Sequence, residues 1–252
     1  MRLFLLLGLV IAATISPAHA QDGVFDMGAL TNTLSQDHVT KSEAQRARQT
    51  VRPAPMNRLS RALALQTGRA APSVAPSVAA HYTPSTAVRE RLATIMAEGT
   101  AHLGQGEADE MRQLVLSRSA LKEYERIAPN LGFQRNNAID AFAFYLLAQW
   151  GVANDHRADI TRAQAAAVRR QAANAYAVVA DQLGSDALRQ EFGEMLAVQA
   201  TIMAGVHEAA VRKGDKAALQ RYADLAQRGG RMIFTMDPTL ITLTDDGFRK
   251  RS

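Results

Sequence analysis

The segment Ala138–Trp150 constrains the fold most strongly, because it is apolar on nearly every side of a helix. Phe142 and Leu146 lie on one face at helical spacing, and further aromatic and aliphatic side chains cover most of the remaining surface. Asn137 is expected to cap this helix, with the Asp140 carboxylate in the first turn. A helix with so little polar surface has to be surrounded by other elements, so the segment predicts the central helix of a bundle.

The rest of residues 81–252 also shows helical apolar spacing, interrupted by Gly, Pro, Asn and Asp. Five further helices are predicted, over about 83–98, 107–127, 159–183, 185–212 and 216–228. Gly229 and Gly230 are expected to end the last of them. Thr239–Thr244 is rich in β-branched residues, but no partner strand is evident, so we expect an extended segment lying on the bundle. The predicted class is all-α, a single bundle of about six helices over 81–252.

The N-terminus has the three parts of a secretory signal peptide. Arg2 supplies the positive charge, 3–15 is an apolar run, and Ser16–Ala20 ends in small residues at positions 18 and 20. Cleavage is expected after Ala20. The apolar run of residues 3–15 is shorter than the roughly 20 residues that a membrane span needs, and no later segment is long and apolar enough. We therefore expect a periplasmic or secreted protein without a transmembrane segment after signal removal.

Residues 21–80 differ in composition from the residues that follow. They carry seven basic and four acidic residues, a net charge of +3, and the stretch 70–80 consists mostly of Ala, Pro and Ser. Such a stretch lacks the large apolar side chains that would offset the entropy lost on ordering. We predict a largely disordered basic tail or linker over 21–80, with a short helix at about 57–66.

Several catalytic and metal-binding classes are not supported by the sequence. The chain contains no cysteine, which excludes thiol catalysis and cysteine-ligated metal sites. His207–Val211 resembles the H-E-x-x-H zinc motif, but Val211 stands where the second histidine is needed. Gly99–Gly106 has the glycine spacing of a phosphate loop but lacks its Lys and Ser/Thr, so a turn between helices is expected. No catalytic, cofactor-binding or metal-ligating residue is predicted.

Two polar segments have ordinary structural interpretations. Asp155, His156 and Asp159 place two carboxylates and an imidazole within five residues, but a metal would need further ligands from another helix. We interpret them as a polar loop, with Asp159 near the start of the next helix, where negative charge is favourable. Arg169 and Arg170 are interpreted as part of a solvated helix face rather than an anion site.

Three residues of the central helix are candidates for a ligand pocket. Asp140 is the one acidic residue on this apolar helix, and a buried carboxyl with a raised pKa can act as a general acid. Its place in the first turn also explains it without catalysis, and no second carboxylate is evident as its partner. Tyr145 and Trp150 can line a pocket between helices or belong to the core.

Several strings resemble those of one protein family. They are Tyr82–Ser85, Asn136–Tyr145 leading to Trp150, Ala167–Ala173 and Leu243–Phe248. Together they resemble an uncharacterised family of secreted bacterial α-helical proteins, classed as a domain of unknown function. The resemblance covers about 81–248 and implies export and a helical fold. It implies no activity and assigns no functional residue.

The leading functional hypothesis is therefore an exported, non-enzymatic binding or protein-interaction module, with an unknown protein or a second copy of the chain as partner. One alternative is binding of polyanions or a membrane surface through the basic 21–80 segment. Nucleic-acid binding is not expected, because the basic residues are few and have no aromatic residues between them. Another alternative is a cell-envelope hydrolase that uses a helix-borne carboxylate such as Asp140.

Overall fold

The computed structural model describes residues 55–67, 71–72 and 76–251. This part of the chain is all-α, as predicted, with eight α-helices and one two-stranded sheet. The helices are α3 (Pro55–Thr67), α4 (Thr86–Thr100), α5 (Gln105–Leu116), α6 (Ser119–Ile127), α7 (Ala138–Ala153), α8 (Arg162–Ala177), α9 (Asp186–Lys213) and α10 (Lys216–Phe234). The strands are β1 (Ile241–Thr244) and β2 (Gly247–Lys250), and the 3₁₀ turns are η1 (Ala101–Leu103), η2 (Ala128–Leu131) and η3 (Pro238–Leu240). The expected signal peptide 1–20, with its cleavage site at Ala20, lies outside the described residues.

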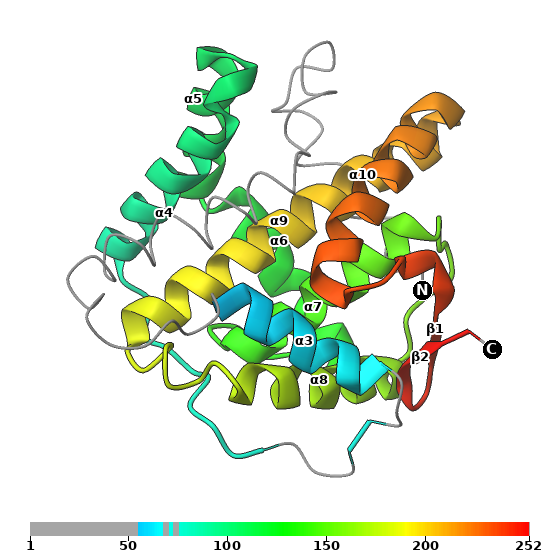
Figure 1. Ribbon diagram of the computed structural model, residues 1–252. Helices are drawn as coiled ribbons and strands as arrows, with labels where there is room; N and C mark the ends of the chain where they lie inside the picture. Colours follow the sequence, from blue (N-terminus) through cyan, green and yellow to red (C-terminus); the bar gives the residue numbers. More distant parts are fainter. Residues whose placement is uncertain (1–54, 68–70, 73–75, 252) are drawn as a thin grey trace.

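Helix α7 is the central helix, as its sequence predicts. All of its residues except Gly151 are buried, and α8, α9 and α10 pack around it (Figure 1). The predicted cap is confirmed, because the Asn137 side chain accepts hydrogen bonds from the backbone N–H groups of Ile139 and Asp140 at 3.0 and 3.2 Å. Helix α7 therefore positions the polar groups at both of its ends within a tightly packed body.

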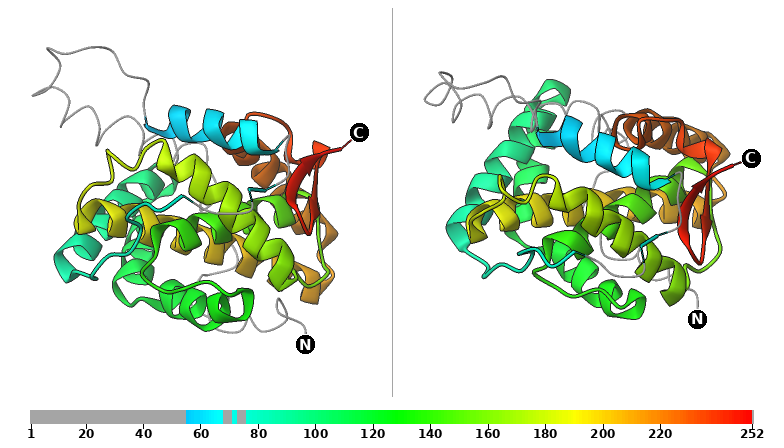
Figure 2. Two further views of the ribbon diagram at one scale, coloured as in Figure 1. Left: turned by 90° about the horizontal axis from the view of Figure 1, so that it is seen from below. Right: turned by 60° about the horizontal axis from the view of Figure 1, so that its bottom comes forward.

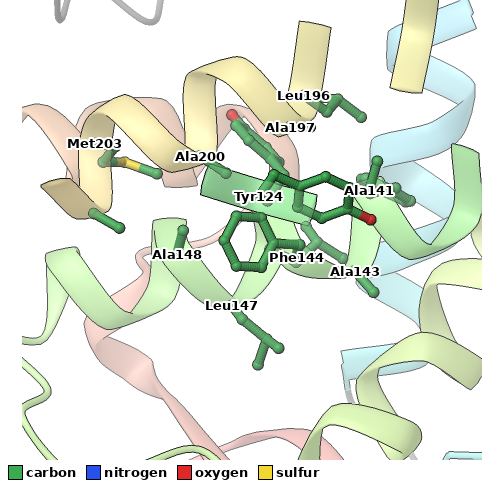
Figure 3. Packing of buried hydrophobic residues seen from close by; sticks show 14 of the residues in the cluster. Tyr124, Ala141, Ala143, Phe144, Leu147, Ala148, Leu196, Ala197, Ala200 and Met203 are labelled. Carbon is green, nitrogen blue, oxygen red and sulfur yellow. The ribbon is translucent and has the colours of Figure 1, made fainter. Parts of the chain in front are cut away.

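Alanines and larger apolar side chains together form the contact between α7 and α9 (Figure 3). Phe144 and Ala148 of α7 lie beside Ala200 and Met203 of α9 in the core cluster. Farther along, a Cβ on Gly193 would lie only 3.3 Å from the backbone Cα of Ala138. Gly193, inside α9, thus permits the close approach of the two helices.

Helix α3 packs into the same core, although the sequence placed it in the linker. The helix predicted at about 57–66 is present, and its side chains Leu59 and Leu63 are fully buried. It lies along α8 and α10 on the outside of the body (Figure 2). Residues 76–80 also contribute, since the Ala80 carbonyl accepts the backbone N–H of Ala138 at 2.9 Å. The linker interpretation does not hold for these residues, because Leu59 and Leu63 of α3 are buried in the core and Ala80 is hydrogen-bonded to the start of α7.

Three helix boundaries differ from the prediction. The helix expected over 159–183 is the shorter α8, because turns follow Ala177. The helix expected over 107–127 is broken into α5 and α6 at Arg118, whose backbone is left-handed with φ 60°. Arg118 pairs there with Glu125 at 2.6 Å. Conversely, α10 continues through Gly229 and Gly230, which are buried, and a Cβ on Gly230 would meet the Pro238 ring at 2.7 Å. Gly230 thus serves close packing rather than helix termination.

The C-terminal segment is a β-hairpin rather than a single extended strand. Strand β1 pairs antiparallel with β2, which supplies the partner that the sequence analysis did not find. The side-chain amide of Gln171 on α8 occupies the outer edge of β2: it accepts the Phe248 backbone N–H at 2.9 Å and donates to the Phe248 carbonyl at 3.0 Å. A helix side chain thus replaces a third strand and holds the hairpin on the bundle.

Candidate functional site

The three candidate pocket residues lie at separate positions along α7. Asp140 is in the first turn and Trp150 near the last, which places them about 15 Å apart along the axis. Tyr145 lies between them and is 1% exposed, within the hydrophobic core. The structure therefore gives each of the three its own surroundings and does not bring them together around one cavity.

Asp140 joins three parts of the chain at the N-terminal end of α7. Its side chain is fully buried, and one carboxylate oxygen accepts a hydrogen bond from Arg169 of α8. The other accepts the backbone N–H of Gln134 at 2.8 Å. Burial raises the pKa of the Asp140 carboxyl, although the Gln134 N–H and the Arg169 charge act in the opposite direction. Arg169, expected on a solvated face, is thus a specific partner of the buried carboxylate.

Trp150 anchors the β-hairpin at the other end of α7. Its indole N–H donates to the backbone carbonyl of Ile241 at 3.0 Å, and its ring lies 6.0 Å from that of Phe248. The His156 ring covers another side of the indole, with a centroid distance of 4.8 Å. These contacts satisfy the one polar atom of a buried tryptophan, which is what a core position requires.

A carboxylate–imidazole pair lies close to Trp150, and the sequence analysis had not joined its two members. Asp155 follows the C-terminal end of α7, whereas His207 comes from α9, and His207 Nε2 lies 2.9 Å from Asp155 Oδ1. The His207 side chain is only 9% exposed, whereas that of Asp155 is 42% exposed. The guanidinium of Arg157 also holds Asp155, at 2.6 Å. The sequence pointed to both a polar loop and a lone histidine, but their 52-residue separation concealed the contact.

The electrostatics of this pair fix the protonation state of the histidine. Burial lowers the pKa of His207, and the nearby Arg157 charge lowers it further, while Asp155 raises it. The pKa of the Asp155 carboxyl is lowered by its hydrogen bonds to Arg157 and His207, which outweigh its partial desolvation. At neutral pH a neutral imidazole therefore donates from Nε2 to a charged carboxylate, which leaves Nδ1 as a proton acceptor.

In chemical terms this pair has the carboxylate and imidazole of a general base. A nucleophile is the further requirement of covalent hydrolysis, and within the described ranges no hydroxyl is hydrogen-bonded to His207. The same ranges contain no group of three or more His, Asp or Glu residues placed to hold a metal ion. None of their helices combines the length and the apolar character needed to cross a membrane.

A comparison with protein families matches residues 2–251 to DUF6683, a family of unknown function. The chain belongs to this family. The match covers nearly the whole sequence and confirms the resemblance to a domain of unknown function. Neither the curated proteins nor the solved structures contain a match to the chain. Membership of DUF6683 assigns no active residue to this chain.

Proposed function

We propose that this DUF6683 protein is exported and acts as a non-enzymatic binding or protein-interaction module. Export is supported by the three-part N-terminal sequence that ends at Ala20. The interaction role is supported chiefly by the hairpin formed by α4 and α5. This hairpin lies at the edge of the molecule, away from α8 and α10 (Figure 1).

The packing of α5 leaves one of its faces outside the core. Its principal contacts are with α4, η1 and α6, and its apolar side chains Met111, Leu114 and Val115 are buried there. The opposite face carries Glu110 and Leu116, both exposed, with Leu116 39% accessible. A helix that contributes little to the central core and presents a mixed polar and apolar face is suited to contact another protein.

The hydrolase alternative receives less support from the geometry around Asp140. Both oxygens of this carboxylate are occupied by donors from Arg169 and Gln134, and the side chain is fully buried. These contacts give Asp140 a structural role that accounts for its burial. The polyanion alternative depends on the basic 21–80 segment, in which Arg58 is already directed to the Val178 carbonyl and lies near Asp181.

Site-specific photo-crosslinking in the native host tests the interaction role. A photoreactive residue at position 110 on α5 is expected to give a discrete crosslinked species, whereas one at the exposed position 250 on β2 is not. Mass spectrometry distinguishes a second copy of the chain from another protein. Equal crosslinking from both positions, or none from position 110, would contradict a role for the hairpin.

Export is tested separately by cell fractionation and by the N-terminal sequence of the purified protein. A mature chain beginning at Gln21 outside the cytoplasm is expected. Recovery of the intact N-terminus from the cytoplasm would overturn this part of the proposal. Retention on an anionic resin that salt abolishes, and that deletion of 21–54 removes, would favour the polyanion alternative instead.

A further inference from the structure

The side-chain amide of Gln171 on α8 joins α3 to the C-terminal hairpin. Its nitrogen donates to the Gln66 backbone carbonyl of α3 and to the Phe248 carbonyl of β2, both at 3.0 Å. Its oxygen accepts the Phe248 backbone N–H at 2.9 Å. The Gln171 side chain is fully buried, so water does not readily replace a lost partner. One buried amide thus holds elements from opposite ends of the described chain.

The same two elements also meet beside this amide. The backbone N–H of Ala71, which follows α3, donates to the Asp246 carbonyl in the turn of the hairpin at 2.9 Å. The first residue of β2, Gly247, has φ 97°, and a Cβ there would lie 2.5 Å from Gln171 Oε1. Gly247 therefore permits both the turn conformation and the close approach of the amide. The shape of the hairpin and the position of the Gln171 side chain depend on each other.

Helix α3 is held to the rest of the protein on one side. Leu59 and Leu63 are buried in the core, whereas Arg61 and Leu65 on the outer side are exposed. The helix packs on α8, α10 and β2 at the outside of the body (Figure 2). Helix α7, in contrast, is buried on nearly every side. Release of α3 uncovers fewer apolar side chains than release of α7, so α3 can open without global unfolding.

We propose that α3, Gln171 and β2 form one cooperative latch, in which release of α3 loosens β2 and disturbance of β2 loosens α3. When α3 leaves, the buried Gln171 nitrogen loses the Gln66 carbonyl, and the amide can turn away from Phe248. When Phe248 shifts, the Gln171 oxygen loses the Phe248 N–H. Strand β1 keeps its own anchor, because the Ile241 carbonyl accepts the Trp150 indole N–H.

The latch couples the two ends of the chain. Helix α3 continues directly from the residues that precede Pro55, and β2 ends at Lys250, close to the C-terminus. A partner that binds the residues before Pro55 therefore alters the C-terminal strand, and by reciprocity a partner of that strand alters α3. The coupling is independent of the proposed interaction role of α4 and α5 and is tested without a partner.

Amide hydrogen exchange of the expected mature chain, 21–252, tests the latch. NMR measures the exchange at increasing urea concentrations below the unfolding transition. The α3 amides and the Phe248 amide are expected to converge on one opening free energy and one urea slope, both smaller than those of α7. Separate values for α3 and Phe248 would overturn the proposal. Values equal to those of α7 would overturn it as well, because exchange would then require global unfolding.

Two substitutions perturb the latch from opposite sides. Leu63→Ala weakens the packing of α3, so the Phe248 amide should exchange at least about tenfold faster. Gly247→Ala strains the turn and displaces the Gln171 amide, so the α3 amides should exchange faster. An unchanged Phe248 rate in the first variant, or unchanged α3 rates in the second, would overturn the proposal.

Two matched controls separate the latch from a general loss of stability. Leu65→Ala removes an exposed leucine of the same helix and should leave the Phe248 rate unchanged. Gly214→Ala introduces similar backbone strain at the C-cap of α9, where φ is 66° and no atom crowds a Cβ. Opening of the latch does not relieve that strain, so the α3 rates should stay unchanged. A rise in α3 exchange equal to that in Gly247→Ala would contradict the latch.

Gln171→Leu tests the role of the amide itself. The variant keeps a side chain of similar size but removes the hydrogen bonds, so α3 and Phe248 should lose their common urea slope. A common slope that persists would show that Gln171 does not couple the two elements. If this variant or Gly247→Ala does not fold, the wild-type urea series and Leu63→Ala decide.

Discussion

An aspartate with a basic partner lies at each end of α7, but the two aspartates differ in their burial. At the N-terminal end, Asp140 is fully buried and pairs with Arg169. At the C-terminal end, Asp155 is exposed and its partner His207 is buried. The pKa of the Asp140 carboxyl is raised by burial, whereas that of Asp155 is lowered by its hydrogen bonds. At the first end burial disfavours the charge of Asp140, and Arg169 and the Gln134 N–H oppose this effect, whereas the contact at the second end includes a carboxylate that solvent reaches.

The comparison predicts the largest loss of stability at Asp140. Asp140→Ala would leave the Gln134 N–H without its acceptor and Arg169 without its counter-charge, so the free energy of unfolding should fall by about 3 kcal/mol. Asp140→Asn should lower the free energy of unfolding by less, because the amide oxygen still accepts one of the two hydrogen bonds. Some loss should remain, because the amide NH₂ group then faces the other donor. Urea denaturation of the mature chain measures both.

The control for this prediction is Asp109→Ala on the exposed face of α5, expected to change stability by less than about 0.5 kcal/mol. A loss at Asp140 no larger than that at Asp109 would show that the buried pair does not stabilise the fold. The contrast between the two ends of α7 would then lose its energetic basis.

An intermediate effect is expected at Trp150. Trp150→Phe removes the indole N–H and leaves the Ile241 carbonyl without this donor, and the smaller ring leaves space beside Phe248. We expect a loss of about 2 kcal/mol, measured by denaturation. His156→Ala, which removes only the ring that covers the indole, should cost less. Equal losses would indicate that stacking, rather than the hydrogen bond, is the main contribution.

A smaller effect is expected at Asp155. Asp155→Ala takes the acceptor from His207, but water can replace an exposed carboxylate, so the loss should be about 1 kcal/mol. The free energy of unfolding should fall by less for Asp155→Ala than for Asp140→Ala under the same conditions. A loss equal to that of Asp140→Ala would contradict the distinction between a buried and an exposed pair.

The smallest effect concerns global stability as a function of pH. The pKa of His207 is lower in the folded protein than its ordinary value, so the unfolded chain binds the proton more readily. Its contribution to stability is fully present above about pH 6.5 and is lost as the pH falls through the folded pKa. His207→Gln should therefore narrow the difference in unfolding free energy between pH 7.5 and 5. The comparison is made by urea denaturation at both pH values, and an unchanged difference would contradict it.

Sequence patterns identified the central helix but missed contacts between distant segments. Asn137 was correctly assigned as a cap because a cap depends on residues within one turn. Gly229 and Gly230 were assigned to a helix end, because the contact of Gly230 with Pro238 depends on a segment that folds back. The hairpin was missed since β2 is short and its outer edge is satisfied by Gln171, a side chain from α8.

Only part of the candidate site could be predicted from the same sequence patterns. Asp140 and Trp150 stood out as polar or aromatic groups on an apolar helix, but nothing near them in sequence indicated Arg169 or Ile241 as partners. His207 was considered only as a metal ligand and was set aside for want of a second histidine. A carboxylate partner from another element leaves no local spacing to recognise.

The sequence by itself determined the helical class and the burial of α7, because apolar periodicity and capping are local properties that each helix carries within its own residues. The tertiary structure alone decided that α3 belongs to the core, that the C-terminus closes as a hairpin on Gln171, and that Asp155 meets His207. Each of these depends on the relative placement of residues at least 52 positions apart, set by how whole faces pack together.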